Sequence, residues 1–197
     1  MLESELKDLK FYLKKSGKEI RKSPRKQFTF FILGFVLSYL FLSGIVSLFP
    51  EILFKAATGI PTEFLLNAQG IETSHEYLQD YTIHVGSSPG TTILISWLCA
   101  GVMEIIILIS AIIASFGVSC EKKLKGIVAG IVTGYVFNLL RVWVTINIIL
   151  TQSVEVADFT HDTLFRLILF VYITGFYVVW FYWSEHGIPK RLKVWEG

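Results

Sequence analysis

The sequence has few charged residues and very little cysteine. Only 17% of its 197 residues are Asp, Glu, Lys or Arg, and the mean hydropathy is +0.58. This composition is too apolar for a soluble domain of this length and indicates a membrane protein. The two cysteines, Cys99 and Cys120, fall at opposite ends of one apolar stretch, some 30 Å apart along a continuous helix. Such a separation would exclude a disulfide between them.

Several other features are missing. There is no internal repeat, no low-complexity linker and no second soluble domain in the sequence, so we expect one bundle of helices. No small-residue cleavage site follows the first apolar stretch, which is therefore expected to remain as an anchor. The net charge is only +2, and no basic stripe with interleaved aromatic residues suggests a nucleic-acid partner.

Four apolar stretches are long enough to cross a bilayer, which takes roughly 20 residues. They cover residues 27–49, 92–117, 126–150 and 164–183. The sequence therefore predicts an all-α integral membrane protein with four transmembrane helices. Residues 27–183 form its single domain, with a small extracytoplasmic cap at 50–91 between the first two helices.

The basic residues predict the orientation of these helices. They precede the first span, lie between the second and third, and follow the fourth, whereas Lys55 is the only basic residue in the other two connections. The three groups are Lys7, Lys10, Lys14, Lys15, Lys18, Arg21, Lys22, Arg25 and Lys26; Lys122, Lys123 and Lys125; and Lys190, Arg191 and Lys193. The positive-inside rule places them, and both termini, in the cytoplasm of a multi-pass plasma-membrane protein.

The terminal segments and the cap carry little chemistry of their own. Residues 1–26 are read as a basic segment, either an amphipathic helix on the inner leaflet or a solvated tail, and 184–197 as a basic tail. In the cap, Gly59-Ile60-Pro61 and 67–70 are predicted breaks, and Tyr81–Val85 alternates as a short strand does. His75 and His84 have no recognised metal spacing and are read as surface or packing residues. We expect no metal and no cofactor.

The stretch Ser96–Gly101 places the thiol of Cys99 near the start of the second span. If a helix begins near Thr92, Cys99 lies roughly 10 Å below the outer surface. Polar and ionisable groups are costly in lipid and indicate a functional site by default. Glu104 follows five residues later, about 140° around an ideal helix, and is therefore read as a structural or orienting group.

The third span carries a stripe of small residues that ends in two polar ones. Gly126, Gly130, Gly134 and Asn138 recur every four residues, a spacing that lets helix backbones approach closely. Arg141, roughly 13 Å deep, follows on the same face. Two interpretations of Arg141 stay open: a buried pair with Glu104, or a place in an outward-facing cavity shared with Cys99.

A thiol, a guanidinium and an imidazole thus fall on the outer half of three elements, because His161 immediately precedes the last span. These groups suffice for acyl transfer through cysteine. His161 would take the thiol proton, since only the thiolate is a good nucleophile. Arg141 would stabilise the oxyanion that forms when Cys99 attacks a peptide carbonyl, and His161 would return the proton to the leaving amine.

The sequence resembles the exosortase/archaeosortase family of membrane transpeptidases. Cys99-Ala100-Gly101 is similar to the family's Cys-[Ser/Ala]-Gly box, Asn138-Leu139-Leu140-Arg141 to its Asn-x-x-Arg box, and His161 stands before the last helix. The resemblance covers about residues 85–183. It implies substrates that are secreted proteins with a C-terminal recognition motif, a transmembrane helix and a basic cluster. In the archaeal branch it implies transfer of the new carboxyl group to a membrane lipid, and in part of that branch an arginine replaces the histidine, so Arg166 is the alternative third group.

Two other functions remain as alternatives. A small transporter or channel would use Glu104, Asn138 and Arg141 as a polar path, and Glu104 would then matter more than Cys99. In a non-enzymatic membrane scaffold, all these polar groups would serve packing.

Overall fold

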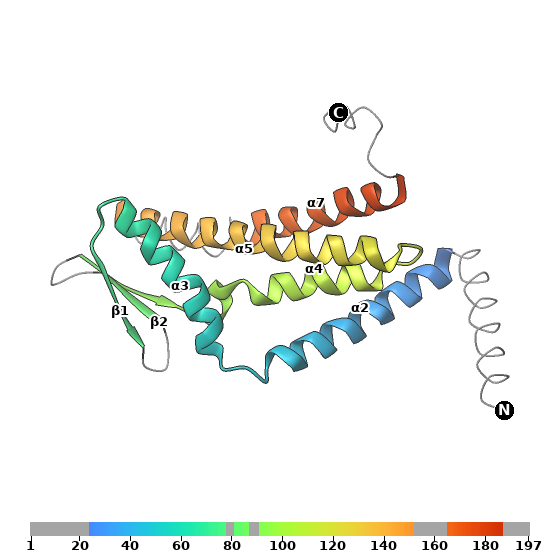
Figure 1. The fold of residues 1–197 in the computed structure, drawn as a ribbon, viewed down its shortest axis with the longest axis horizontal. Coiled ribbons are helices and arrows are strands. Elements are labelled where there is room, and N and C mark those ends of the chain that lie inside the picture. The colour runs from blue at the N-terminus through green and yellow to red at the C-terminus, as the bar shows by residue number, and fades with distance from the viewer. Residues whose placement is uncertain (1–23, 78–80, 87–90, 152–164, 187–197) are drawn as a thin grey trace.

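The computed structural model describes residues 24–77, 81–86, 91–151 and 165–186, and within them the chain is mostly helical. The long helices lie roughly along one direction, and the remaining elements gather at one end of the bundle (Figure 1). The elements are α2 (Pro24–Val46), α3 (Glu51–Ala68), β1 (Thr73–Tyr77), β2 (Tyr81–Val85), β3 (Thr91–Ile95), the 3₁₀ helix η1 (Trp97–Ala100), α4 (Val102–Ala114), α5 (Cys120–Thr151) and α7 (Phe165–His186).

Three helices in the described part of the chain are long and apolar enough to span a membrane: α2, α5 and α7. Large apolar side chains such as Phe28, Leu37 and Phe41 on α2 are more than half exposed. In water such a surface would be costly, whereas lipid tails cover it at no loss. These helices support a membrane-spanning protein and correspond to three of the four predicted spans; the count of four spans and the orientation remain predictions.

The prediction of one continuous helix over residues 92–117 is wrong. These residues form β3, η1 and α4 in succession. The run of β-branched residues at 91–93 favours a strand, and Gly101 breaks the chain direction with a left-handed φ of 71° before α4 begins. Helix α4 has 13 residues, about 20 Å of length, against a hydrocarbon core of about 30 Å. The predicted depth of Cys99, its separation from Cys120 and its angle to Glu104 all assumed a helix that does not exist.

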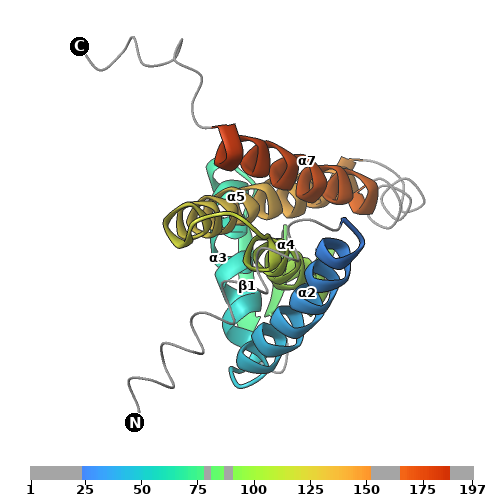
Figure 2. The same ribbon diagram turned by 90° about the vertical axis from the view of Figure 1, so that its right-hand side faces the viewer.

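Helix α4 occupies the centre of the bundle, between α2, α5 and α7 (Figure 2). The predicted small-residue face of α5 is confirmed, because every member of the stripe is buried. A Cβ at Gly126 would overlap the Trp180 indole of α7. At Gly130, the same atom would lie 3.0 Å from Leu108 of α4. The missing side chains therefore allow α5 to approach both neighbours closely.

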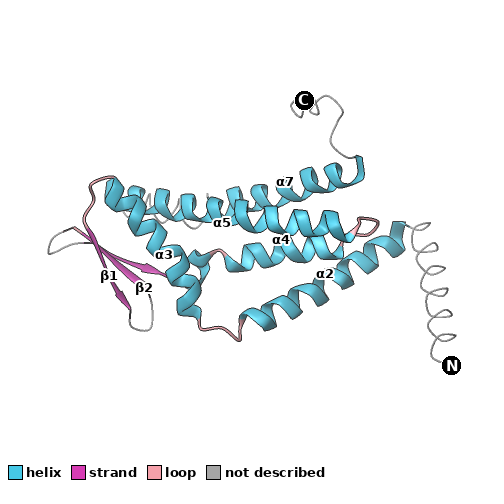
Figure 3. Cartoon of the chain, viewed as in Figure 1, coloured by secondary structure: helices cyan, strands magenta, loops and turns pink. Residues whose placement is uncertain are grey.

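The cap is made of α3 and a three-stranded antiparallel sheet in the order β1-β2-β3. Strands occur only at this end of the described structure (Figure 3), so the all-α prediction is corrected to a mostly helical fold with a sheet in its cap. The predicted strand Tyr81–Val85 is confirmed as β2. The expected cap range of 50–91 is short by four residues, because β3 runs to Ile95.

The predicted break at Gly59-Ile60-Pro61 is wrong, since all three residues lie inside α3. Pro61 has no N–H, so the carbonyl oxygen of Ala57, four residues earlier, lacks its helical donor. The hydroxyl of Tyr135 on α5 donates to that oxygen at 2.6 Å. Gly59 is needed for a different reason: a Cβ there would overlap the ring of Tyr81.

A single apolar core joins the sheet to the second half of α5. Its fully buried members include Leu66 of α3, Tyr81 and Ile83 of β2, Ile95 of β3 and Ile146 of α5. Because these side chains come from four elements, the cap holds β3 and the turn after it against α5. The position of Cys99 therefore depends on the cap as well as on the bundle.

The cap histidines make local polar contacts. His75 Nδ1 lies 2.9 Å from Glu63 Oε2, and the hydroxyl of Tyr81 donates to Glu63 Oε1 at 2.9 Å. His84 Nδ1 lies 3.2 Å from Thr92 Oγ1 on the neighbouring strand. These contacts agree with the interpretation of both histidines as surface or packing residues.

Charge is distributed unequally between the two ends of the bundle. Lys122, Lys123 and Lys125 lie at the start of α5, at the end opposite the sheet. On the cap side, Lys55 lies 3.1 Å from Glu51. The predicted amphipathic segment at 1–26 and the basic tail at 184–197 fall mostly outside the described residues.

Candidate active site

Cys99 lies in η1, the single turn between β3 and α4, and is partly buried. Its backbone N–H donates to the carbonyl of Ser96 at 3.0 Å. The Ser96 hydroxyl lies 3.2 Å from Sγ of Cys99, within hydrogen-bond range for sulfur. Both cysteines lie among the described residues and neither forms a disulfide; Cys120 is exposed at the start of α5.

Three successive carbonyls around Cys99 are each held by a side chain from another helix. Arg141 Nη2 donates to the Leu98 carbonyl at 3.0 Å, and Asn138 Nδ2 donates to the Cys99 carbonyl at 2.9 Å. Thr58 Oγ1 of α3 donates to the next carbonyl, that of Ala100, at 3.4 Å. Carbonyls at the end of a short helix have no partner within it, so these donors satisfy the turn and hold it in place.

The spacing of Asn138 and Arg141 explains how one helix holds two neighbouring carbonyls. Residues three apart on a helix lie on the same face, here the face of α5 that meets η1. Close contact also requires the glycine that follows the turn. A Cβ on Gly101 would lie 2.5 Å from Asn138 Cγ, and the φ of 71° is one that glycine adopts readily.

Arg141 has a second partner in Glu104, on the first turn of α4. Nη1 lies 3.9 Å from Glu104 Oε1, and the two side chains are 10% and 21% exposed. A charged group in a membrane needs such a partner or water. The two interpretations of Arg141 are therefore compatible, since Arg141 pairs with Glu104 and also lines the same pocket as Cys99. Glu104 itself does not line that pocket.

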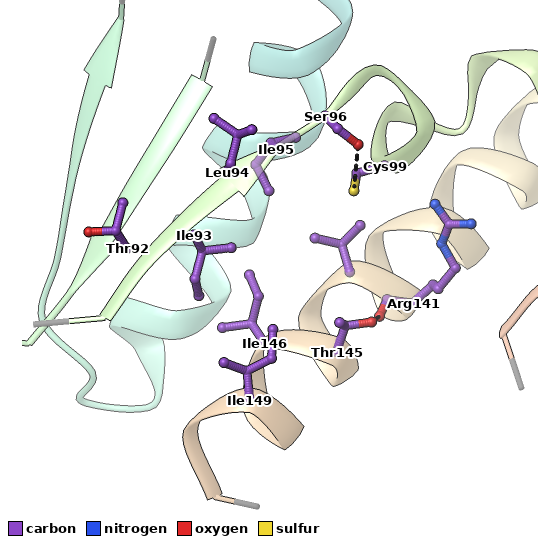
Figure 4. Close-up of a pocket in the computed structure, with 11 residues that line it drawn as sticks. Thr92, Ile93, Leu94, Ile95, Ser96, Cys99, Arg141, Thr145, Ile146 and Ile149 are labelled. Atoms are coloured by element: carbon purple, nitrogen blue, oxygen red, sulfur yellow. Dashed lines mark hydrogen bonds between the residues drawn. The ribbon is translucent and has the colours of Figure 1, made fainter. Parts of the chain in front are cut away.

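The pocket beside Cys99 lies between β3 and α5 and has a volume of about 330 Å³. Figure 4 shows Cys99 and Arg141 at one end of it, with Thr92 and Ile149 at the other. Its walls are mostly aliphatic, with hydroxyl groups from Thr92, Ser96 and Thr145. The lining residues are Thr92, Ile93, Leu94, Ile95, Ser96, Cys99, Arg141, Val142, Thr145, Ile146 and Ile149. A thiol and a guanidinium are thus presented together to an apolar cavity.

The predicted third group does not fall within the described structure. His161 lies outside it, and Arg166 is in the first turn of α7 with its side chain outside the description. Leu169, one turn further along α7, lines a small space together with Glu104 and Asn138. Because Leu169 lies about one helical turn after Arg166, the first turn of α7 lies close to Glu104 and Asn138.

Two parts of the site were not recognised in the sequence. The sequence pattern assigns no role to Ser96, the first residue of the stretch around Cys99, although its hydroxyl contacts the thiol. Strand β3 was included in a membrane helix, although the β-branched Thr91-Thr92-Ile93 was a signal for a strand.

Within the described residues, no group of three or more His, Cys, Asp or Glu side chains is placed to hold a metal ion.

The chain matches no protein-family model, and no curated protein or solved structure is significantly similar to it.

Proposed function

We propose that this protein is a membrane-embedded cysteine transpeptidase that cleaves the C-terminal sorting signal of secreted proteins. The observation that carries the proposal is the shared pocket of Cys99 and Arg141, two groups that lie far apart in the sequence. The thiol supplies a nucleophile and the guanidinium a donor for a developing oxyanion, in a site partly shielded from water. Cys99 and Arg141, one residue from each of the two boxes similar to those of the exosortase/archaeosortase family, both line this pocket.

The reaction proceeds in two steps. Cys99 loses its proton to His161 or, if Arg166 fills the third role by stabilising the thiolate, to water, and Sγ attacks the carbonyl carbon of the scissile peptide bond. The C–N bond breaks, the leaving amine takes the proton, and a thioester remains on Cys99. A hydroxyl or amine of the acceptor, such as a membrane lipid, then attacks the thioester and releases the thiol.

Arg141 has enough N–H groups to donate to a substrate oxygen as well as to its partners within the protein. A guanidinium carries five N–H groups, and the contacts to the Leu98 carbonyl and to Glu104 engage Nη2 and Nη1. Because those contacts hold the group in place beforehand, little reorganisation is needed when charge develops on the substrate oxygen. Glu104 acts through Arg141 and is a positioning residue.

The orientation predicted from the basic residues fits such a substrate. With the sheet end outside, the substrate's transmembrane helix would lie parallel to α2, α5 and α7, and its basic cluster would be in the cytoplasm. Its recognition motif would then be level with Cys99. A reagent that modifies thiols only from outside should label Cys99 and spare Cys120, and the reverse pattern would contradict this orientation.

A transport function has little support from the geometry. It requires a polar path past Glu104, Asn138 and Arg141. The space that Glu104 and Asn138 share in the described structure measures about 10 Å³, at most enough for one water molecule. The cavity beside the thiol, at about 330 Å³, is larger than this space, and Glu104 and Asn138 do not line it.

The decisive experiment compares Cys99→Ala with Cys120→Ala. The first variant should fold and reach the membrane but leave the C-terminal signal of its substrate uncleaved, whereas the second should process normally. Mass spectrometry of the wild type should detect an acyl adduct on Cys99. Normal processing by Cys99→Ala would overturn the proposal, and loss in both variants would indicate a structural effect.

The third group is identified by comparing His161→Ala and Arg166→Ala with His84→Ala. If His161 is the base, its variant should lose at least about 100-fold in processing rate and the other two should lose much less. If Arg166 fills the role, the order of the first two reverses. Equal losses in all three variants would contradict a catalytic role for either residue.

A further inference from the structure

Strand β3 leaves one of its edges open in the described structure. The sheet order β1-β2-β3 places β3 at the end of the sheet, hydrogen-bonded to β2 on one side. In an antiparallel pair, alternate residues direct both their N–H and their C=O away from the partner strand. An open strand edge is therefore a ready template for pairing with another extended chain.

This edge belongs to the pocket that holds the thiol. Five consecutive residues, from Thr92 to Ser96, line the pocket. The pocket therefore runs along the strand and does not contact only one or two of its side chains. The chain then turns through η1, and Cys99 follows Ile95 by four residues. Figure 4 shows β3 leading along the pocket towards the turn that carries Cys99.

The wall opposite β3 is aliphatic. Val142, Ile146 and Ile149 of α5 line it, and Ile93 and Ile95 line the strand side. Side chains of an extended peptide alternate between two faces, so every second residue would enter this cavity. Its chemistry suits aliphatic side chains, and the main-chain groups of β3 supply the polar partners.

Resting on the proposed function, we infer that the substrate's recognition segment binds as an added strand along the open edge of β3. The segment before the scissile bond runs parallel to β3, because β3 leads from the cap towards Cys99 and the peptide must reach the thiol by its C-terminal end. Main-chain hydrogen bonds to β3 hold the peptide, and an aliphatic residue near the scissile bond fills the pocket. Recognition by strand addition accepts varied sequences, with selectivity set by alternate side chains.

The test uses a tetrapeptide of alternating alanine and valine with an acetyl group at its N-terminus and a chloromethyl ketone at its C-terminus. The Cys99 thiolate displaces chloride, so a C–S bond forms as the C–Cl bond breaks and the thiol proton goes to the buffer. The protein is the full chain in membranes with Cys120→Ser, which leaves Cys99 as the only thiol. Four further peptides each carry one N-methyl group, which removes one backbone donor.

Strand addition predicts an alternating pattern of alkylation rates. N-methylation at two alternate positions should slow alkylation roughly tenfold each, because the methyl group removes one hydrogen bond and takes up the space beside the strand. N-methylation at the other two positions should change the alkylation rate less than twofold. The alkylation rate with iodoacetamide, which has no peptide backbone to pair with β3, measures the reactivity of the Cys99 thiol itself. Each peptide rate is divided by it. Equal effects at all four positions, or none, would overturn the inference.

A pair of protein variants tests where the peptide lies. Ile149→Trp fills the pocket and should slow the peptide at least tenfold but leave the iodoacetamide rate unchanged. Ile148→Trp is the matched control, because Ile148 is adjacent and does not line the pocket. An unchanged peptide rate in Ile149→Trp would show that the peptide does not use this cavity.

The alkylation assay depends on peptide binding and on the Cys99 thiol, and it does not require cleavage of the natural substrate. It therefore tests strand addition separately from the transpeptidase proposal. If Cys99→Ala blocks processing of the natural substrate while the N-methyl pattern is flat, strand addition is wrong and the transpeptidase proposal stands. If Cys99→Ala processes normally, the transpeptidase proposal fails whatever the peptides show.

Discussion

The glycine after the cysteine turn should be one of the residues least tolerant of substitution. Gly101 has a φ of 71°, and an alanine in this left-handed region costs about 1–2 kcal/mol. The new Cβ would also lie 2.5 Å from Cγ, 2.7 Å from Oδ1 and 2.8 Å from Nδ2 of Asn138, and relieving such overpacking costs about 1–3 kcal/mol. Gly101→Ala should therefore lower the free energy of unfolding by about 2–5 kcal/mol.

Two other glycines separate these effects. Gly70 has a φ of 80° with nothing within 4 Å of its would-be Cβ, so Gly70→Ala should cost only the conformational part, about 1–2 kcal/mol. Gly44 lies inside α2 with equally open space, and Gly44→Ala should be neutral or stabilising by up to about 1 kcal/mol. The free energy of unfolding should be highest for Gly44→Ala, lower for Gly70→Ala and lowest for Gly101→Ala.

The measurement is unfolding in mixed detergent micelles with increasing sodium dodecyl sulfate, followed by tryptophan fluorescence. A double variant tests the contact itself. Asn138→Ala makes room for the new methyl group, so the double variant with Gly101→Ala should cost at least about 1 kcal/mol less than the sum of the single changes. If Gly101→Ala costs the same as Gly70→Ala, or if the two changes simply add, the proposed contact does not constrain the turn.

Three further predictions concern other contacts. Gly126→Ala places a methyl group against the Trp180 indole and should destabilise the protein by about 1–3 kcal/mol in the same unfolding assay, whereas no change would contradict close packing of α5 on α7. Tyr135→Phe leaves a helix carbonyl without its donor and should cost about 1 kcal/mol, and an unchanged midpoint would show that the bond contributes nothing. Glu104→Gln should slow substrate processing several-fold, while Arg141→Ala should slow it about 100-fold or more; the opposite order would contradict the role of Arg141 as the oxyanion donor.

Much of the fold could be predicted because it depends on local pattern. The apolar runs of α2, α5 and α7 are long enough to identify without tertiary information, and the four-residue period of glycines predicted which face of α5 is buried. The alternation at Tyr81–Val85 was enough to predict one strand of the cap. In each case the physical cause acts within one helix or strand.

Part of the candidate site could be predicted in its membership, but its geometry could not. Cys99, Asn138 and Arg141 were selected as unusual residues in apolar surroundings, and the structure brings them together. The donors' targets are backbone carbonyls of a turn that was expected to be helical. Because a continuous helix would have used those carbonyls itself, their availability could not be read from the side chains alone.

The class of protein and the packing face of α5 follow from the sequence by itself, since burial of apolar and small residues depends on period and length. Tertiary structure decided where the second apolar run breaks, with the β-branched residues at 91–93 as a weaker local signal. An apolar run of 92–117 is compatible with one helix, but the sheet formed with β2 and the contact of Gly101 with Asn138 favour a strand, a turn and a short helix. Those long-range contacts place the thiol of Cys99 in a pocket with Arg141.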